Sequence, residues 1–121
     1  MGSYRSYLKF GNIKGEVTEP AYRFWIELKS VSEQRAGAGT DISCTKDQDS
    51  TTPLLLQYCA QGRTADAVID AVRESGGVSL RIETSDALIS GIVLGSGHPP
   101  MESVDIAGKI NHKFEPGTPP P

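Results

Sequence analysis

Hydrophobic and polar residues alternate with a period of two near the end of the chain. From Ser103 to Glu115 one set of alternate positions is polar, and the other is mostly apolar: Val104, Ile106, Gly108, Ile110, His112 and Phe114. This pattern predicts a strand with one face in a hydrophobic core. Gly108 indicates either a bulge or a close approach of another backbone within that strand.

Four more segments have the character of strands. Residues 5–10 alternate and end at the turn signal Gly11-Asn12, and Tyr22–Val31 places Phe24, Ile26 and Leu28 on one face. Val78–Ile82 also alternates. Leu88–Leu94 is more continuously apolar, which is typical of a strand covered on both sides.

One short helix is predicted over residues 53–61. Pro53 suits the first helical position, and Gly62 suits the position just after the last. The residues before the proline supply candidate N-caps: Ser50, Thr51 and Thr52.

The segment Thr64–Glu74 is ambiguous. A candidate cap, apolar residues at helical spacing and the terminal Gly76-Gly77 favour a second helix. A reading with period two gives a poorer strand. Local rules alone therefore favour the helix at this point.

Two segments are predicted to lack regular structure. Ser32–Thr40 is polar and rich in small residues, which indicates a long exposed loop. The proline-rich end, residues 116–121, is expected to form a disordered tail after a single domain spanning residues 1–115. Many strands, few helices and glycine-rich turns predict a mainly β protein, either a barrel or a sandwich, with one short helix.

Composition excludes several classes of protein. The 121 residues carry a formal charge of −3, which argues against nucleic-acid binding. No stretch approaches the roughly 18 apolar residues of a membrane span. The N-terminus lacks the apolar core of a cleavable signal peptide, so export would need another route.

Candidate catalytic and metal-binding residues are few and scattered. Cys44 and Cys59 have no CxxC spacing, and His98 and His112 belong to no ligand cluster. A reactive pair of Cys59 with His112 remains an alternative, although the apolar surroundings of Cys59 favour an inert thiol. We therefore expect no enzymatic activity, no cofactor and no metal.

Three blocks in order resemble the haemolysin-coregulated protein (Hcp) family, the inner-tube subunit of type VI secretion systems. The blocks are YLKFGNIKGE (Tyr7–Glu16), FWIELKSVS (Phe24–Ser32) and DISCTKDQDSTTPLLLQYCAQG (Asp41–Gly62). The similarity continues through LISGIVLGSG to the closing HKFEP and covers nearly the whole chain. It implies an Hcp-like, phage-tail-tube-like β-barrel, and a strand rather than a helix at Thr64–Glu74. Compared with the usual family pattern, the loop at Ser32–Thr40 is short.

The resemblance also implies a function. Subunits would form hexameric rings that stack into a tube, with sheath and spike proteins as partners and small effectors in the lumen. The protein would be cytoplasmic before firing and secreted afterwards. The loop that would reach a neighbouring subunit or ring contains Glu33, Gln34, Arg35, Ala36, Gly37, Ala38, Gly39 and Thr40. The alternatives are a tail-tube subunit of another phage-derived contractile particle and a monomeric β-barrel that binds a ligand or adaptor.

Overall fold

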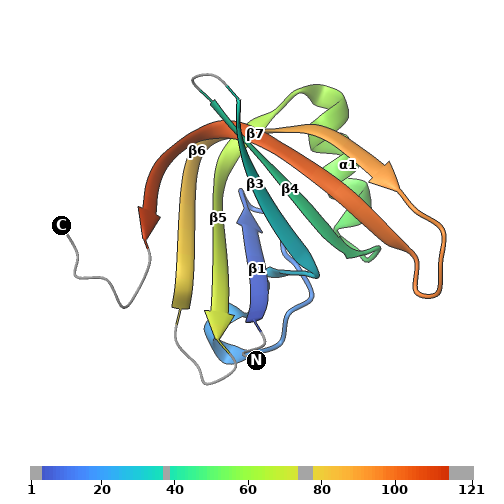
Figure 1. The fold of residues 1–121 in the computed structure, drawn as a ribbon. Helices are drawn as coiled ribbons and strands as arrows, with labels where there is room; N and C mark the ends of the chain where they lie inside the picture. Colours follow the sequence, from blue (N-terminus) through green and yellow to red (C-terminus); the bar gives the residue numbers. More distant parts are fainter. Residues whose placement is uncertain (1–3, 37–38, 74–77, 115–121) are drawn as a thin grey trace.

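A single antiparallel sheet dominates the structure, a computed structural model that describes residues 4–36, 39–73 and 78–114 (Figure 1). Its seven strands lie in the order β2-β1-β5-β6-β7-β4-β3. The strands are β1 (Tyr4–Phe10), β2 (Ile26–Leu28), β3 (Ser30–Ala36), β4 (Gly39–Asp47), β5 (Thr64–Arg73), β6 (Val78–Leu94) and β7 (Met101–Phe114). A 3-10 turn, η1 (Pro20–Tyr22), and one helix, α1 (Thr52–Gln61), complete the fold. The prediction of a mainly β, Hcp-like barrel with one short helix is confirmed.

The two edge strands of the sheet are consecutive in the chain. β2 pairs with β1 and β3 pairs with β4, and only Lys29 separates them. The backbone N–H of Lys29 donates to the carbonyl of Thr45, 2.6 Å away. This connection brings the two ends of the strand order together, so the sheet curls into a barrel-like form.

The predicted strand Tyr22–Val31 is therefore wrong in its extent. Tyr22 lies in η1, and the backbone of Phe24 has a φ of +69°, which interrupts any strand there. The apolar alternation identified Ile26 and Leu28 correctly as core residues. The alternation changes phase at the Lys29 connection, because Val31 packs against the core while Ser30 is exposed.

The core consists of the inward-facing residues of the sheet and one face of α1. Leu8 and Phe10 of β1 are fully buried, as is Leu55 of α1. The rest of this cluster comes from the loop after β1 and from strands across the sheet: Ile13, Ile26, Leu28, Ile42, Cys44, Ala67, Ile69, Ile82, Ala87, Ile89, Val104 and Ile106. The alternation of β7 is confirmed at Val104 and Ile106, whereas the side chains of Ile110, His112 and Phe114 lie outside the described residues.

Helix α1 begins and ends close to the predicted residues. Gly62 adopts the left-handed conformation, with φ +61°. Its N–H donates to the carbonyl of Cys59, and that of Arg63 donates to the carbonyl of Tyr58, which together form a Schellman motif. The predicted side-chain cap is not present, because Thr51 at the N-cap makes no such hydrogen bond.

Four other predictions have mixed outcomes. The segment 64–73 is strand β5, as the family resemblance implied, while Glu74 lies outside the described residues. The long loop at Ser32–Thr40 is wrong: β3 continues to Ala36, which pairs with Gly39, and residues 37 and 38 lie outside the described residues. Leu88–Leu94 is part of one 17-residue strand, but Val93 is 66% exposed, so this strand is not covered on both sides throughout. The predicted tail, 116–121, is not among the described residues.

Gly108 sits where β6 and β7 approach each other closely. A Cβ at this position would lie 2.5 Å from Thr84 Cγ2 and 3.5 Å from Ala87 Cα. The β6–β7 register shifts between Ser85 and Leu88, directly opposite. The close approach predicted from the sequence is confirmed.

We expect Gly108→Ala to lower the free energy of unfolding by about 1–3 kcal/mol, because the new methyl group must displace the buried Thr84. Gly91→Ala is the matched control, since its Cβ would meet only Asp105 Oδ2 at 3.8 Å. Urea unfolding of both variants measures the difference. Equal midpoints for the two would contradict the close packing at Gly108.

Candidate functional site: surfaces for assembly

The residues proposed as an intersubunit loop form the far end of the β3–β4 hairpin. Glu33–Ala36 belong to β3, and Gly39 and Thr40 begin β4. Gly37 and Ala38 lie between them, outside the described residues. Figure 1 shows this hairpin extending from the top of the sheet. β3 pairs with β4 alone among the strands of the sheet, so its other edge carries backbone groups that could pair with a further strand.

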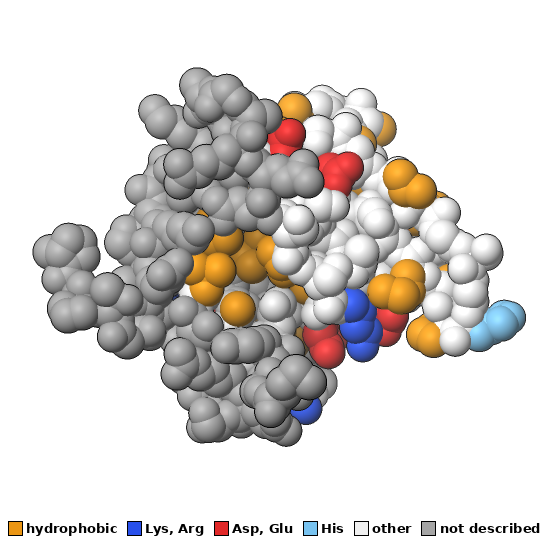
Figure 2. All heavy atoms as spheres, viewed as in Figure 1, with side chains coloured by type: hydrophobic (Ala, Val, Ile, Leu, Met, Phe, Trp, Pro, Cys, Tyr) orange, Lys and Arg blue, Asp and Glu red, His pale blue; other side chains and the backbone are white. Residues whose placement is uncertain are grey.

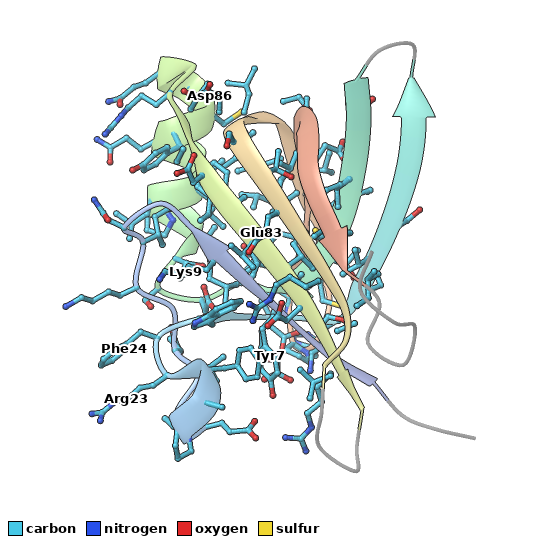
Figure 3. All side chains as sticks on the ribbon, turned by 90° about the vertical axis from the view of Figure 1, so that its left-hand side faces the viewer. Tyr7, Lys9, Arg23, Phe24, Glu83 and Asp86 are labelled. Carbon is cyan, nitrogen blue, oxygen red and sulfur yellow. The ribbon has the colours of Figure 1, made fainter. Side chains whose placement is uncertain are left out.

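The outer face of β1 and β5 is covered by the segment that contains η1. The ring of Tyr22 stacks on that of Tyr7 at 4.4 Å, and Trp25 meets Tyr22 edge-on at 4.9 Å. Figure 3 shows Tyr7 beneath this segment. Tyr7 is therefore buried, although it alternates with the core residues Leu8 and Phe10 and lies on the other face of β1.

A buried carboxylate holds the segment that contains η1 against the sheet. Asp70 of β5 is fully buried and accepts two hydrogen bonds of 2.6 Å from Arg81 of β6. It also accepts one of 2.8 Å from the hydroxyl of Tyr22. Burial, followed by this contact with Asp70, raises the pKa of Tyr22 to about 12. Sequence analysis did not identify this cluster, because Asp70 and Tyr22 are 48 positions apart.

A second buried polar cluster lies at the start of α1. Lys46 of β4 is fully buried and forms an ion pair with the buried Glu102 of β7. Its ammonium group also donates to Asp49 Oδ1 at 3.0 Å and to the carbonyl of Asp47 at 2.8 Å. Burial raises the pKa of Asp49, but hydrogen bonds from Thr51 and Lys46 outweigh it and leave that pKa lowered. The cluster ties β4, β7 and α1 together.

Acidic residues line a surface groove of about 410 Å³ beside this cluster. Glu16, Glu27, Asp47 and Asp49 contribute carboxylates, and Lys29 contributes one cation. Glu16 accepts a hydrogen bond from the backbone N–H of Ser50. The side-chain hydroxyl of Ser50, followed by this backbone contact, lowers the pKa of Glu16. Within residues 4–36, 39–73 and 78–114, no group of three or more His, Cys, Asp or Glu side chains is arranged to hold a metal ion.

The reactive residue types are separated in space. Cys44 is fully buried in the core and Cys59 is half-buried in α1, and both thiols are free. His98 lies in the exposed turn between β6 and β7, while the side chain of His112 is outside the described residues. The structure thus supports the interpretation of Cys44 as a small core residue.

The burial of Cys44 predicts alkaline sensitivity. Burial, with a smaller effect of the Asp105 carboxylate, raises the pKa of Cys44 from 9.0 to about 12. A group whose pKa is higher in the folded state than in the unfolded state stabilises the fold fully at pH values below its unfolded-state pKa. This contribution is lost as the pH rises toward the folded-state pKa. We therefore expect Cys44 to lower the free energy of unfolding by up to about 1.4 kcal/mol for each pH unit between about pH 9 and 12.

Urea midpoints between pH 8 and 11 test this expectation. Cys44→Ala should give a shallower fall than the parent protein, and Cys59→Ala should keep the parent slope because Cys59 is half-buried. An unchanged slope in Cys44→Ala would show that the thiol does not titrate in this way.

Several large apolar side chains are exposed. Val93 and Leu94 at the end of β6 lie near Met101 at the start of β7, and Figure 2 shows hydrophobic side chains over this end of the hairpin. Leu54 and Leu56 of α1 and Phe24 after η1 are also exposed. A contiguous exposed apolar patch, such as the one formed by Val93, Leu94 and Met101, marks an interaction site, whereas apolar side chains exposed singly are ordinary.

Comparison with known proteins identifies the family. The family model described as "Type VI secretion system effector, Hcp" matches residues 7–111, most of the chain. The chain belongs to the Hcp family. A comparison with curated protein sequences gives no match. No helix in the part of the chain that the structure describes has the length and apolar character needed to cross a membrane.

Solved structures share the Hcp fold at low sequence identity. Hcp1 from Salmonella typhimurium is 19% identical, with a TM-score of 0.78 over 93% of this chain and 85% of that one. A type VI secretion system effector from Yersinia pestis is 16% identical, with a TM-score of 0.78 over 91% of this chain and 98% of that one. A chain from the PVC sheath–tube complex of an extracellular contractile injection system is 13% identical, with a TM-score of 0.63 over 92% of this chain and 88% of that one.

Proposed function

We propose that this chain is a structural subunit of the inner tube of a type VI secretion system. Subunits form hexameric rings, and the rings stack into a conduit that carries small effector proteins in its lumen. The observation that carries this proposal is the match of the Hcp family model to residues 7–111. The sheath and spike proteins of the apparatus are the other partners, and the subunit is cytoplasmic until the tube is fired out of the cell.

The surfaces of the subunit support assembly. The edge of β3 away from β4 offers unpaired backbone groups, and exposed apolar side chains lie at the ends of β6 and β7 and on α1. Burial of these groups against neighbouring copies would stabilise a ring. A ring needs head-to-tail contacts, in which two different surfaces of the same chain meet.

The end of the β3–β4 hairpin, Glu33–Thr40, is proposed to contact a neighbouring subunit or ring. Its position at one end of the sheet supports this role, because a hairpin that extends beyond the barrel can reach another molecule (Figure 1).

A tail-tube subunit of another contractile particle is the second candidate. The similarity to a chain of the PVC sheath–tube complex supports it, with a TM-score of 0.63. Both candidates predict rings, and copurification with sheath proteins of one apparatus or the other separates them.

Size-exclusion chromatography with light scattering tests the assembly itself. We expect a particle of six times the 13.0 kDa monomer mass. A monomer at every concentration up to the high micromolar range would contradict the proposed function.

A further inference from the structure

Phe24 is a bulky aromatic residue that the fold holds in an unfavourable backbone conformation at the surface. Its φ of +69° is rare for a large side chain, and 48% of its surface is exposed. Strain of this kind persists only where the surroundings enforce it, and it is found preferentially at functional sites.

Hydrogen bonds and close packing hold the backbone of Phe24 in this conformation. The Phe24 N–H donates to the carbonyl of Val17 at 2.9 Å, and the Phe24 carbonyl accepts from Gly15 N–H at 2.7 Å. Gly15 leaves no room for adjustment, because a Cβ there would lie 2.1 Å from the Trp25 carbonyl oxygen. The fold thus fixes the position of a side chain that contributes little to its core.

Two cations flank the ring of Phe24. Lys14 Nζ lies 5.6 Å from the ring centroid, and Arg23 Cζ lies 5.0 Å from it. Neither cation forms an ion pair with a described acidic side chain. We call Lys14, Arg23 and Phe24 the cationic knob. Exposed aromatic and arginine side chains are the types that dominate binding energy at interfaces.

A surface of opposite charge lies across the molecule. Asp41 and Asp105 line a hollow of about 250 Å³ with Ser43 and Ser90, on the outer face of β4, β7 and β6. Gly91, opposite Asp105 in the register, leaves the space open. Neither aspartate forms an ion pair with a side chain that the structure describes. We call these four residues the acidic hollow.

The two surfaces are opposite in charge and lie on different sides of the molecule. The hollow is open at the surface, and its polar lining presents two carboxylates to cationic side chains. Figure 3 shows Arg23 and Phe24 on one side of the molecule and strands β3 and β4 on the other. A contact between them is head-to-tail, which is the kind that closes a ring.

We propose that the cationic knob of one subunit docks into the acidic hollow of a second copy of this chain. Lys14 and Arg23 meet Asp41 and Asp105, and the ring of Phe24, which lies between the two cations, packs at the rim of the hollow. Complementary charges fix the partner and the register of such a contact. This inference rests on the proposed ring assembly and assigns one of its contacts.

Charge exchange tests the contact. The variant Lys14→Glu/Arg23→Glu carries an acidic knob and an acidic hollow, while Asp41→Lys/Asp105→Lys carries a basic knob and a basic hollow. We expect the association constant of each variant alone to fall at least tenfold, measured by light scattering. Mixed in equal amounts, the two should assemble again, with the two variants alternating in native mass spectra.

Two further variants complete the experiment. Phe24→Gly keeps the backbone conformation, because glycine accepts a positive φ, and it should weaken assembly at an unchanged melting temperature. Arg63→Glu is the matched control: Arg63 lies over the ring of Tyr58 at 4.5 Å and belongs to neither the knob nor the hollow, so its loss should leave assembly unchanged.

The outcomes separate this inference from the proposed function. If the parent protein assembles and both charge variants assemble equally well, the contact is wrong and the ring stands. If each variant alone is monomeric and the equal mixture of the two is also monomeric, the knob and the hollow are not partners. A parent protein that never assembles would overturn both proposals.

Discussion

Replacing Lys46 with methionine should lower the free energy of unfolding by about 3–5 kcal/mol. The substitution leaves Glu102 fully buried without its cation, and an uncompensated buried charge is among the most destabilising changes a fold can suffer. Because Lys46 joins β4 to β7 and to the start of α1, we expect the loss to be global. Urea unfolding followed by circular dichroism measures it.

Two further variants show whether charge burial is the cause. Lys29→Met removes a lysine whose pairing with Asp47, at 3.7 Å, is exposed, so it should change stability by no more than about 1 kcal/mol. The double variant Lys46→Met/Glu102→Leu should recover most of the loss, because an apolar pair can replace a buried ion pair. Failure of the double variant to recover would mean that packing of the Lys46 chain, and not its charge, matters most.

Gly15→Ala is expected to be the second strongly destabilising change, at about 3 kcal/mol or more. Its Cβ would lie 2.1 Å from the Trp25 carbonyl oxygen and 2.8 Å from the Ile26 nitrogen. Both are backbone atoms, so the start of β2 must move for the methyl group to fit, with more strain than ordinary overpacking. Trp25 is the only tryptophan, and its fluorescence reports the change directly.

Gly62→Ala serves as the comparison for Gly15→Ala. Its Cβ would meet no atom within 4 Å, so only the positive φ of +61° opposes it, at about 1 kcal/mol. Similar costs for the two substitutions would contradict the close backbone approach at Gly15.

The pattern of hydrophobic residues predicted the strands and the helix that pack against the same part of the structure along their whole length. β7 shows this best, because its described apolar positions, Val104 and Ile106, both face the one core. The short helix was also predictable, since Pro53 and Gly62 act within a single turn. Thr64–Arg73 was not predictable from local rules, because its helical spacing is overridden by pairing with β1 and β6 on either side.

The assembly surfaces were the least predictable features. Phe24 alternates with its neighbours as a core residue would, and only the backbone conformation reveals that it points outward. Asp41 and Asp105 are 64 positions apart in sequence and come together through the pairing of β4 with β7. The interpretation of Ser32–Thr40 as a loop failed because small polar residues are as compatible with an exposed hairpin as with an irregular segment.

Negative-stain electron microscopy of the purified protein, with light scattering on the same sample, shows whether the subunits assemble into rings. We expect ring-shaped particles with a mass of six times 13.0 kDa, and tubes where the rings stack. Particles of monomer mass, with no rings at high micromolar concentration, would contradict it.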